Sequence, residues 1–232
     1  MGRAYGRRFE HHESIFKNRE AASKELINIL PRDILKANET VVLGVSEGGV
    51  YFANEVAKAL NTHLDLLLTE PILSPKNPEL AIAMVGETQE VVMHKALIDS
   101  FGISKDYIYA QADHKYQEKI LYYIHKYRHG SRLDGLNEKY VVLVDECVET
   151  GLTMMTAIKT AISLGAKNVF IAVPILDNVV YENLLKVCDN LFCPHKIDDY
   201  VSIEYYYENL ERFTFEEIDK IMAENERRRN EQ

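Results

Sequence analysis

The apolar residues of this chain form short continuous runs that alternate with longer stretches of helical periodicity. The runs are rich in β-branched residues, as strands buried on both faces of a sheet are. They lie at residues 40–45, 64–69, 140–144, 168–175 and 190–193. The periodic stretches, which predict helices, lie at residues 53–60, 152–164 and 179–187. This alternation predicts an α/β fold with a mostly parallel central sheet flanked by helices.

Local signals mark where several helices begin or end. Asn18 can cap a helix that continues until Pro31 interrupts it. Gly165 is placed to end the helix over 152–164. Thr214 and Glu217 form a capping box that starts the last helix.

The middle of the chain has a less regular pattern. Three prolines within residues 71–80 predict a loop, whereas 81–85 and 90–94 predict two short strands that would pair as a hairpin. A long helix is predicted over 104–127, with one stripe of side chains that suits the core or a dimer face: Ile108, Ala112, Tyr116, Ile120, Ile124 and Tyr127. Tyr205–Tyr207 fit either a base pocket or a terminal strand buried on one face.

The chain has 232 residues, 47% of them hydrophobic and 27% charged, which suits a single globular domain over residues 1–232. Residues 1–14 lack an apolar core and are expected to form a flexible arm, and residues 214–232 a C-terminal helix. The net charge of −9 argues against general binding of nucleic acid, and no apolar run has the length of a transmembrane helix. With three cysteines and no signal-like start, the protein is expected in the cytoplasm, with neither nucleic acid nor membrane as a partner.

The segment Cys188-x4-Cys193-x-His195 allows two interpretations. Its three side chains are of the types that bind zinc, but their spacing is unusual for a zinc site. Buried thiols at a strand are the favoured interpretation.

Two loops after predicted strands carry the candidate chemistry, because ligands of parallel sheets bind beyond the carboxyl ends of the strands. The first, Ser46-Glu47-Gly48-Gly49, follows the strand over 40–45. Its paired glycines let backbone N–H groups approach an anion. The spacing matches neither the dinucleotide fingerprint nor the P-loop, so this loop by itself is a weak indication.

The second loop, within "VVLVDECVETGLT" (141–153), is more specific. Threonine hydroxyls and free N–H groups at a helix start form a cradle for a phosphate. Asp145 and Glu146 can accept hydrogen bonds from vicinal hydroxyls or support Mg²⁺ through water. Together these features predict a site for a sugar phosphate.

In this loop the sequence resembles the type I phosphoribosyltransferases, whose signature is an apolar strand, two acids, two or three variable residues and T-G-x-T. It is similar in particular to a bacterial branch that opens with an FxNRxxA helix, here "FKNREAA". The segments "VVLGVSEGGVYFANEVAKAL" and "NPELAIAMV" follow in that family's order. The resemblance implies a parallel sheet with a small hood, phosphoribosyl pyrophosphate as donor, Mg²⁺ as cofactor and a homodimer.

The resemblance also implies a role for each residue of the two loops. Asp145 and Glu146 would bind the ribose hydroxyls and, through water, the metal ion. The 5′-phosphate would lie against Glu149, Thr150, Gly151, Leu152 and Thr153. The pyrophosphate would lie against Ser46, Glu47, Gly48 and Gly49. Glu149 would be the catalytic residue, at the place where purine-salvage relatives carry an acid proposed to manage the proton of the base.

Several positions depart from the family pattern, and the departures favour negative charge. Glu47 stands where relatives usually carry a cation, and Glu70-Pro71 stands where they usually carry an arginine-lysine pair. Glu146 is usually aspartate, and Glu149 is often a small residue. Because pyrophosphate carries several negative charges, these acids should weaken binding of the full donor unless additional Mg²⁺ bridges them.

Three hypotheses follow for the function. The first is a phosphoribosyltransferase that transfers phosphoribose to or from a nitrogenous base. The second is a binding or regulatory protein that keeps the nucleoside-monophosphate half of the site and has lost the transfer. The third, an unrelated α/β domain with a coincidental T-G-x-T turn, is disfavoured by the ordered resemblance over most of the chain. The acceptor base is not determined by the sequence.

Overall fold

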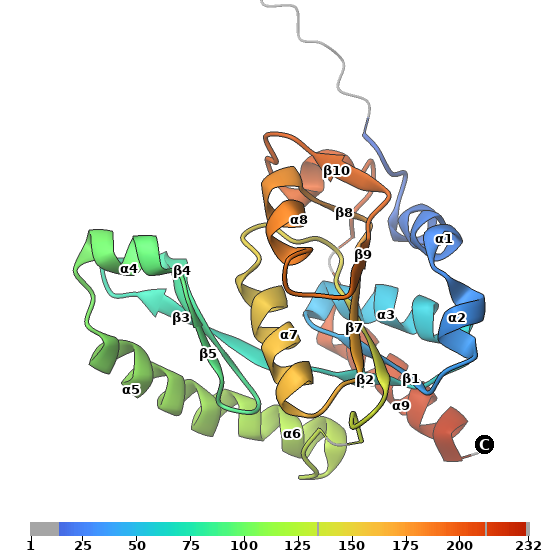
Figure 1. Ribbon diagram of the computed structural model, residues 1–232, viewed down its shortest axis with the longest axis horizontal. Helices are drawn as coiled ribbons and strands as arrows, with labels where there is room; N and C mark the ends of the chain where they lie inside the picture. Colours follow the sequence, from blue (N-terminus) through green and yellow to red (C-terminus); the bar gives the residue numbers. More distant parts are fainter. Residues whose placement is uncertain (1–13, 134, 212, 231–232) are drawn as a thin grey trace, which may run out of the picture.

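The computed structural model describes residues 14–133, 135–211 and 213–230, and its centre is a five-stranded parallel sheet (Figure 1). The strand order is β2-β1-β6-β7-β9, and every neighbouring pair is parallel. The strands are β1 (Thr40–Gly44), β2 (Leu64–Leu66), β6 (Tyr140–Val144), β7 (Asn168–Ala172) and β9 (Asn190–Phe192). The predicted fold class is therefore confirmed. The arm expected over 1–14 lies outside the described residues, apart from Ser14.

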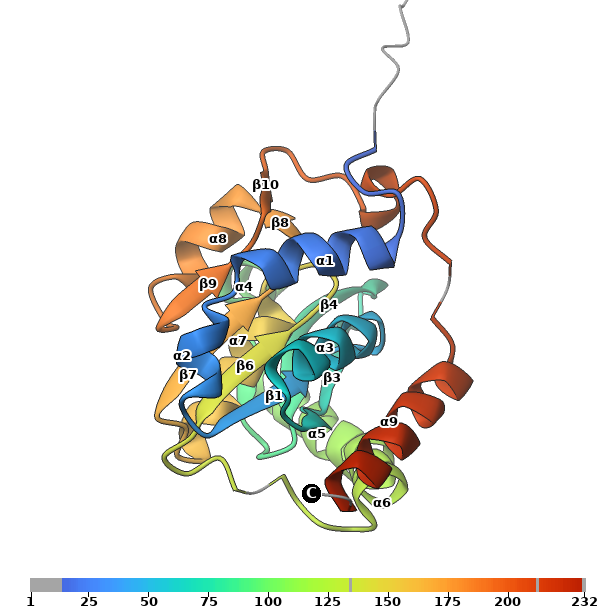
Figure 2. The same cartoon turned by 90° about the vertical axis from the view of Figure 1, so that its right-hand side faces the viewer.

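Helices cover both faces of this sheet, because successive residues of a strand point to opposite sides. Val42 packs into the core of one face, and Leu43 into the core of the other. The first face is covered by α1 (Arg19–Ile29), α2 (Arg32–Lys36), α3 (Glu47–Leu60) and α9 (Phe215–Asn230). The second is covered by α7 (Leu152–Ser163) and α8 (Asn178–Leu184). Figure 2 shows α1 and α3 on the near side of β1 and β6. None of the helices in the described ranges is long and apolar enough to cross a lipid bilayer.

The helix ends follow the signals in the sequence. The Asn18 side chain accepts a hydrogen bond of 2.9 Å from the N–H of Ala21 at the start of α1. Thr214 and Glu217 exchange the hydrogen bonds of a capping box before α9. Gly165, with φ +84°, follows the end of α7. These predicted boundaries are confirmed.

A long segment between β2 and β6 projects to one side of the central sheet (Figure 1). It contains β3 (Thr69–Ser74), β4 (Asn77–Gly86), β5 (Val91–Met93), α4 (Lys95–Phe101), α5 (Lys105–Lys115), a π-helical turn (Tyr116–Ile120) and α6 (Leu121–Arg128). The hairpin predicted from 81–85 and 90–94 is confirmed as the antiparallel pair of β4 and β5.

The loop predicted over 71–80 is wrong, because β3 and the start of β4 occupy it. Pro71 lies in β3, which is an edge strand of its sheet. Pro78 lies near the start of β4, beside the irregular register between Ile72 and Ser74. Sheets tolerate proline at edges and irregularities, so three prolines did not exclude strands here.

The long helix predicted over 104–127 is present, but it contains a π-helical turn that the sequence did not reveal. Its buried side chains recur at every fourth residue from Ile108 to Ile124. Four residues of an α-helix advance about 40° beyond a full turn, so this stripe would wind away from the core. One extra residue in a π-helical turn rotates the residues that follow it back toward the core. The buried side chains at both ends of the long helix therefore face the same sheet, that of β3, β4 and β5.

Beyond the carboxyl ends of β7 and β9 the chain forms a small cap (Figure 1). The cap contains β8 (Ile175–Asp177), β10 (His195–Ile197) and a 3-10 helix (Ile203–Tyr206). The strand considered for Tyr205–Tyr207 is wrong. Tyr206 and Tyr207 are both buried, whereas a strand buried on one face would bury alternate residues.

The residues of the proposed zinc alternative make other contacts. The Cys193 thiol donates to the carbonyl of His195, with 3.2 Å between Sγ and oxygen. Burial raises the pKa of Cys193 to about 12, which keeps it a neutral thiol. His195 Nε2 lies 2.7 Å from Glu25 Oε2. Cys188 and Cys193 are half-buried, so the favoured interpretation of buried thiols holds only in part.

A buried ion pair ties the projecting segment to the central sheet. Arg128 Nη2, at the end of α6, donates to Glu87 Oε2 over 2.7 Å, and the two side chains are 8% and 2% exposed. The other oxygen of Glu87 accepts from the N–H of Leu68, just after β2. Burial raises the pKa of Glu87, and Arg128 opposes that rise. One carboxylate therefore joins β2, the turn after β4 and the end of the long helix.

We predict that Arg128→Met lowers the free energy of unfolding by about 3–5 kcal/mol, because it leaves a buried carboxylate without its cation. Urea unfolding followed by circular dichroism measures this. Lys24→Met is the control, because the Lys24–Glu20 pair is exposed and its loss should leave the midpoint nearly unchanged. Equal midpoints for the two variants would contradict the prediction.

Candidate functional site

The two candidate loops lie side by side because β1 and β6 pair in parallel. Their register joins Thr40 to Tyr140 and Gly44 to Val144, so both strands end at the same level. The N–H of Val45 then donates to the carbonyl of Val144 over 3.1 Å. Loop 46–49 and loop 145–151 therefore begin as neighbours at the carboxyl edge of the sheet.

Asp145 connects the two loops. Its side chain is almost completely buried, and its Oδ1 accepts a short hydrogen bond from the hydroxyl of Ser46. The same oxygen accepts from the N–H of Glu146 at 2.8 Å. Burial raises the pKa of Asp145 to about 7, although both hydrogen bonds favour the charged form.

Glu146 is held away from solvent by a residue that the sequence analysis did not single out. Arg19, the first residue of α1, donates from Nη2 and Nε to Glu146 Oε2 over 2.9 and 3.1 Å. The two side chains are only 13% and 19% exposed. The Glu146 carboxylate also fills the space above Gly48, where a Cβ atom would overlap it. Arg19 belongs to the "FKNREAA" segment that carries the family resemblance, and that position was the sequence signal for its role in the site.

Arg19 also links Glu146 to the C-terminal part of the chain. Its Nη1 donates to the carbonyl of Glu211, and its guanidinium lies 5.8 Å from the centre of the Phe213 ring. The neighbouring segments pair as well, because Phe16 and Tyr207 form a parallel bridge. One arginine thus joins the acidic loop, helix α1 and the segment that precedes α9.

The turn over 149–153 leaves the start of α7 without a side-chain cap. Gly151 occupies the N-cap position with φ +79°, a conformation that favours glycine. The N–H of Leu152 donates a long hydrogen bond to Thr150 Oγ1, with 3.5 Å between nitrogen and oxygen, and Thr153 is partly exposed. The first N–H groups of a helix lack intrahelical partners, so this turn can bind an anion.

Two further polar groups lie near the acids, one half-buried and one buried. Cys147 is a neutral thiol, because burial raises its pKa to about 12. The hydroxyl of Tyr207 is buried without a hydrogen-bond partner in the described part of the chain. Burial and then the charge of Glu146 raise the pKa of Tyr207. A buried hydroxyl without a partner costs about 1–3 kcal/mol.

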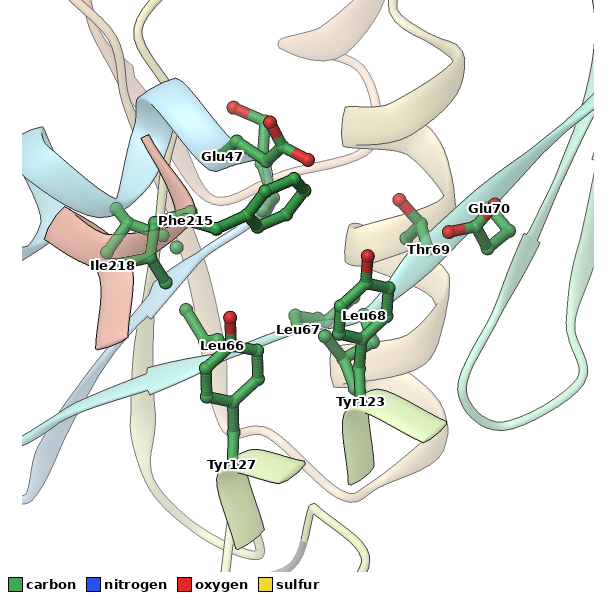
Figure 3. A pocket seen from close by; sticks show the side chains of 14 residues that line it. Glu47, Leu66, Leu67, Leu68, Thr69, Glu70, Tyr123, Tyr127, Phe215 and Ile218 are labelled. Atoms are coloured by element: carbon green, nitrogen blue, oxygen red, sulfur yellow. The ribbon is translucent and has the colours of Figure 1, made fainter. Parts of the chain in front are cut away.

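Glu47 and Glu70, which lie far apart in the sequence, line one cleft of about 120 Å³ (Figure 3). Glu47 begins α3, and Glu70 lies in β3. The pKa of Glu70 is raised mainly by burial and also by Glu47, whereas Lys115 and Lys119 lower it. The helix that carries these lysines thus brings cations near Glu70, a compensation that the sequence analysis did not foresee.

The acids at the strand end suit magnesium only together with a ligand. Carboxylate oxygens are the donors that Mg²⁺ prefers, and it commonly combines one or two of them with water and phosphate oxygens. Within the described residues no three side chains of His, Cys, Asp or Glu gather as a metal site. Ser46 already binds Oδ1 of Asp145, and Arg19 binds Oε2 of Glu146, so only the other oxygen of each carboxylate would be left for a metal ion that also binds a ligand.

Comparison with known proteins identifies the family. Residues 11–209 match the family model described as "Phosphoribosyl transferase domain". The chain belongs to this family, which confirms the resemblance to type I phosphoribosyltransferases. The crystal structure of TT1426 from Thermus thermophilus is similar to this one, with a TM-score of 0.71 and 28% identity, over 90% of this chain and 98% of that chain.

A longer relative is found in Mycobacterium tuberculosis (strain H37Rv). This protein, "Putative phosphoribosyl transferase Rv0571c", is 28% identical over 209 residues, which cover 90% of this chain and 46% of the relative. The chain therefore spans about half the length of the curated relatives it matches.

We predict that Asp145→Asn changes the pH dependence of stability. The folded-state pKa of about 7 lies above the ordinary value of 3.8, so between these values the folded protein keeps a proton that the unfolded chain has lost. Wild-type stability contributed by this group therefore falls as pH rises through that window. With EDTA in both samples, the melting temperature of the variant minus that of wild type should rise from about pH 4 to about pH 7. Above that pH the difference should level off. A difference that is constant with pH would contradict this.

Proposed function

We propose that this protein binds a 5-phosphorylated ribose across the two loops and transfers phosphoribose to or from a nitrogenous base. The observation that supports this most directly is the uncapped start of α7 beside two acids. Gly151 supplies no capping side chain, and Asp145 and Glu146 precede it in the same loop. A phosphate suits the helix start, and vicinal hydroxyls suit carboxylate acceptors.

Each residue then has a defined task. The N–H groups of Gly151, Leu152 and Thr153 and the threonine hydroxyls donate to the 5′-phosphate, with Glu149 at its edge. Asp145 and Glu146 accept from the ribose hydroxyls, and Ser46 keeps Asp145 in place. The loop of Ser46, Glu47, Gly48 and Gly49 faces the leaving group. Glu149, which is exposed beside the turn, exchanges the proton of the base.

Magnesium is the proposed cofactor, held through water by Asp145 and Glu146. When bound, it would neutralise the charge that develops on pyrophosphate. The residues of this chain contribute the orientation. Arg19 fixes one carboxylate against Gly48, and Ser46 fixes the other, so both acids are positioned before a ligand arrives.

A second candidate is a protein that binds a nucleoside monophosphate without transferring phosphoribose. The convergence of Glu47 and Glu70 in one cleft supports it. Two like charges at 4 Å and an effective dielectric constant of 20 repel by about 4 kcal/mol. That repulsion would act on pyrophosphate and not on the 5′-phosphate. Lys115, 3.8 Å from Glu70, compensates part of it.

The domain extent, compartment, oligomeric state and small-molecule partner are also proposals, and they rest on the membership of the phosphoribosyltransferase family. We place residues 1–232 in one phosphoribosyltransferase-like domain that acts in the cytoplasm as a homodimer. The partner is a small phosphorylated ribose, either phosphoribosyl pyrophosphate or a nucleotide. The three free cysteines agree with a reducing compartment.

We predict that ribose 5-phosphate raises the melting temperature of the wild-type protein, because it binds the folded state alone. Thr153→Ala should remove most of that increase, since it deletes a donor at the start of α7. Ser163→Ala, at the other end of the same helix, is the matched control and should retain it. If no phosphorylated ribose stabilises the wild type, both candidate functions are refuted.

A second experiment separates the two candidates. Release of pyrophosphate from phosphoribosyl pyrophosphate and Mg²⁺ is measured against a panel of nitrogenous bases. Turnover supports transfer, whereas monophosphate binding without turnover supports the binding protein. Glu47→Arg should increase affinity for the donor, because it replaces a repulsive charge with an attractive one. Unchanged affinity would show that residue 47 does not face pyrophosphate.

A further inference from the structure

The carboxylate of Glu146 occupies the space in front of the loop over 46–49. A Cβ atom built on Gly48 would overlap both oxygens of this carboxylate. At the start of α3, Ser46 Oγ accepts a hydrogen bond of 3.0 Å from the N–H of Gly49. The N–H groups of Glu47 and Gly48 are therefore those that remain for an anion. A carboxylate of the protein thus lies where an anion would approach this loop.

Arg19 holds this carboxylate from the neighbouring helix. Its Nη2 and Nε both donate to Oε2 of Glu146, and the Arg19 side chain is 13% exposed. Helices α1 and α3 lie on the same face of the sheet (Figure 2), which brings the first residue of α1 close to the first turn of α3. Glutamate is one methylene longer than the aspartate that is usual at position 146, so its carboxylate reaches Arg19 while it lies over Gly48.

We propose that Arg19 is a pyrophosphate-binding residue, which exchanges the Glu146 carboxylate for a phosphoryl group when pyrophosphate displaces Glu146 from Gly48. This inference rests on the proposed function, in which the loop over 46–49 faces the leaving group. A guanidinium that donates two N–H groups to a carboxylate can donate them to a phosphate in the same way. Glu146 is then released to accept from the ribose hydroxyls.

The exchange supplies the cation that the loop itself lacks. Glu47 stands where relatives usually carry a cation, and within the described ranges no lysine or arginine lines the cleft of Glu47 and Glu70. Arg19 provides the positive charge from α1 instead. Glu146 neutralises this charge in the free protein, and pyrophosphate does so in the complex. The guanidinium therefore stays paired throughout, which avoids the free-energy cost of a largely buried charge without a partner.

The test measures the binding of inorganic pyrophosphate by isothermal titration in EDTA, in variants without the competing carboxylate. Glu146→Gln should bind pyrophosphate several-fold more tightly than wild type, because Gly48 and Arg19 are then free to meet the anion. Adding Arg19→Gln to this variant should weaken binding at least about tenfold, since a charge-assisted hydrogen bond is lost. A residue that only held Glu146 in place would have no effect in this background.

Two further variants in the Glu146→Gln background serve as controls. Arg19→Lys should retain part of the affinity, because it keeps the charge and loses the planar fork. Lys24→Gln, at an exposed position of the same helix, should bind pyrophosphate as Glu146→Gln does. The backbone amide signals of Gly48 and Gly49 should shift when pyrophosphate is added to Glu146→Gln.

Three results would overturn the proposal. They are no binding of pyrophosphate to Glu146→Gln, equal affinity with and without Arg19→Gln, and amide shifts that leave out Gly48 and Gly49. Stabilisation by ribose 5-phosphate reports on the proposed function separately. If ribose 5-phosphate stabilises the wild type and Arg19 does not affect pyrophosphate binding, this inference fails and the proposed function stands. If no phosphorylated ribose binds, the proposed function fails even where pyrophosphate binding depends on Arg19.

Discussion

The parallel pairing of β1 and β6 is the constraint on which the rest of the site depends. Five consecutive residue pairs in register bring the ends of the two strands to one level. The loops that follow can then share hydrogen bonds, as Ser46 and Asp145 do. A shift of one residue would turn Val42 and Val142 toward the opposite core and separate these loops. The hydrophobic alternation that buries both faces therefore also fixes the geometry of the candidate site.

The carboxyl edge of the sheet carries acids in two different environments. Asp145 is buried and Glu146 is half-buried, and both are held by partners, Ser46 for one and Arg19 for the other. Glu47 and Glu70 line an open cleft beside aromatic rings. This second pair lies near lysines of the long helix, Lys115 beside Glu70 and Lys126 over the Tyr127 ring. One edge of the sheet thus holds two pairs of acids whose charges are compensated by different segments of the chain.

The projecting segment contributes to the site because ion pairs and a hydrogen bond join it to the end of β2. Glu87 and Arg128 join the end of the long helix to β2, and this helix places Tyr123 and Tyr127 in the cleft wall. On the other side, α7 packs closely against β4, since a Cβ atom at Gly86 would lie 2.7 Å from Thr160 Oγ1. The phosphate turn at the start of α7 and the cleft are therefore connected through the same inserted strands.

The sequence by itself determined the elements whose signals are local. Continuous apolar runs gave the parallel strands, and Asn18, Thr214 and Gly165 gave helix ends, because capping and periodicity depend on neighbouring residues. The T-G-x-T turn after two acids predicts a phosphate site for the same reason, and that site is a proposal. Only the tertiary structure decided the pairings between distant residues. Arg19 with Glu146, Glu47 with Glu70 in one cleft, and prolines in an edge strand depend on contacts between segments that local patterns do not encode.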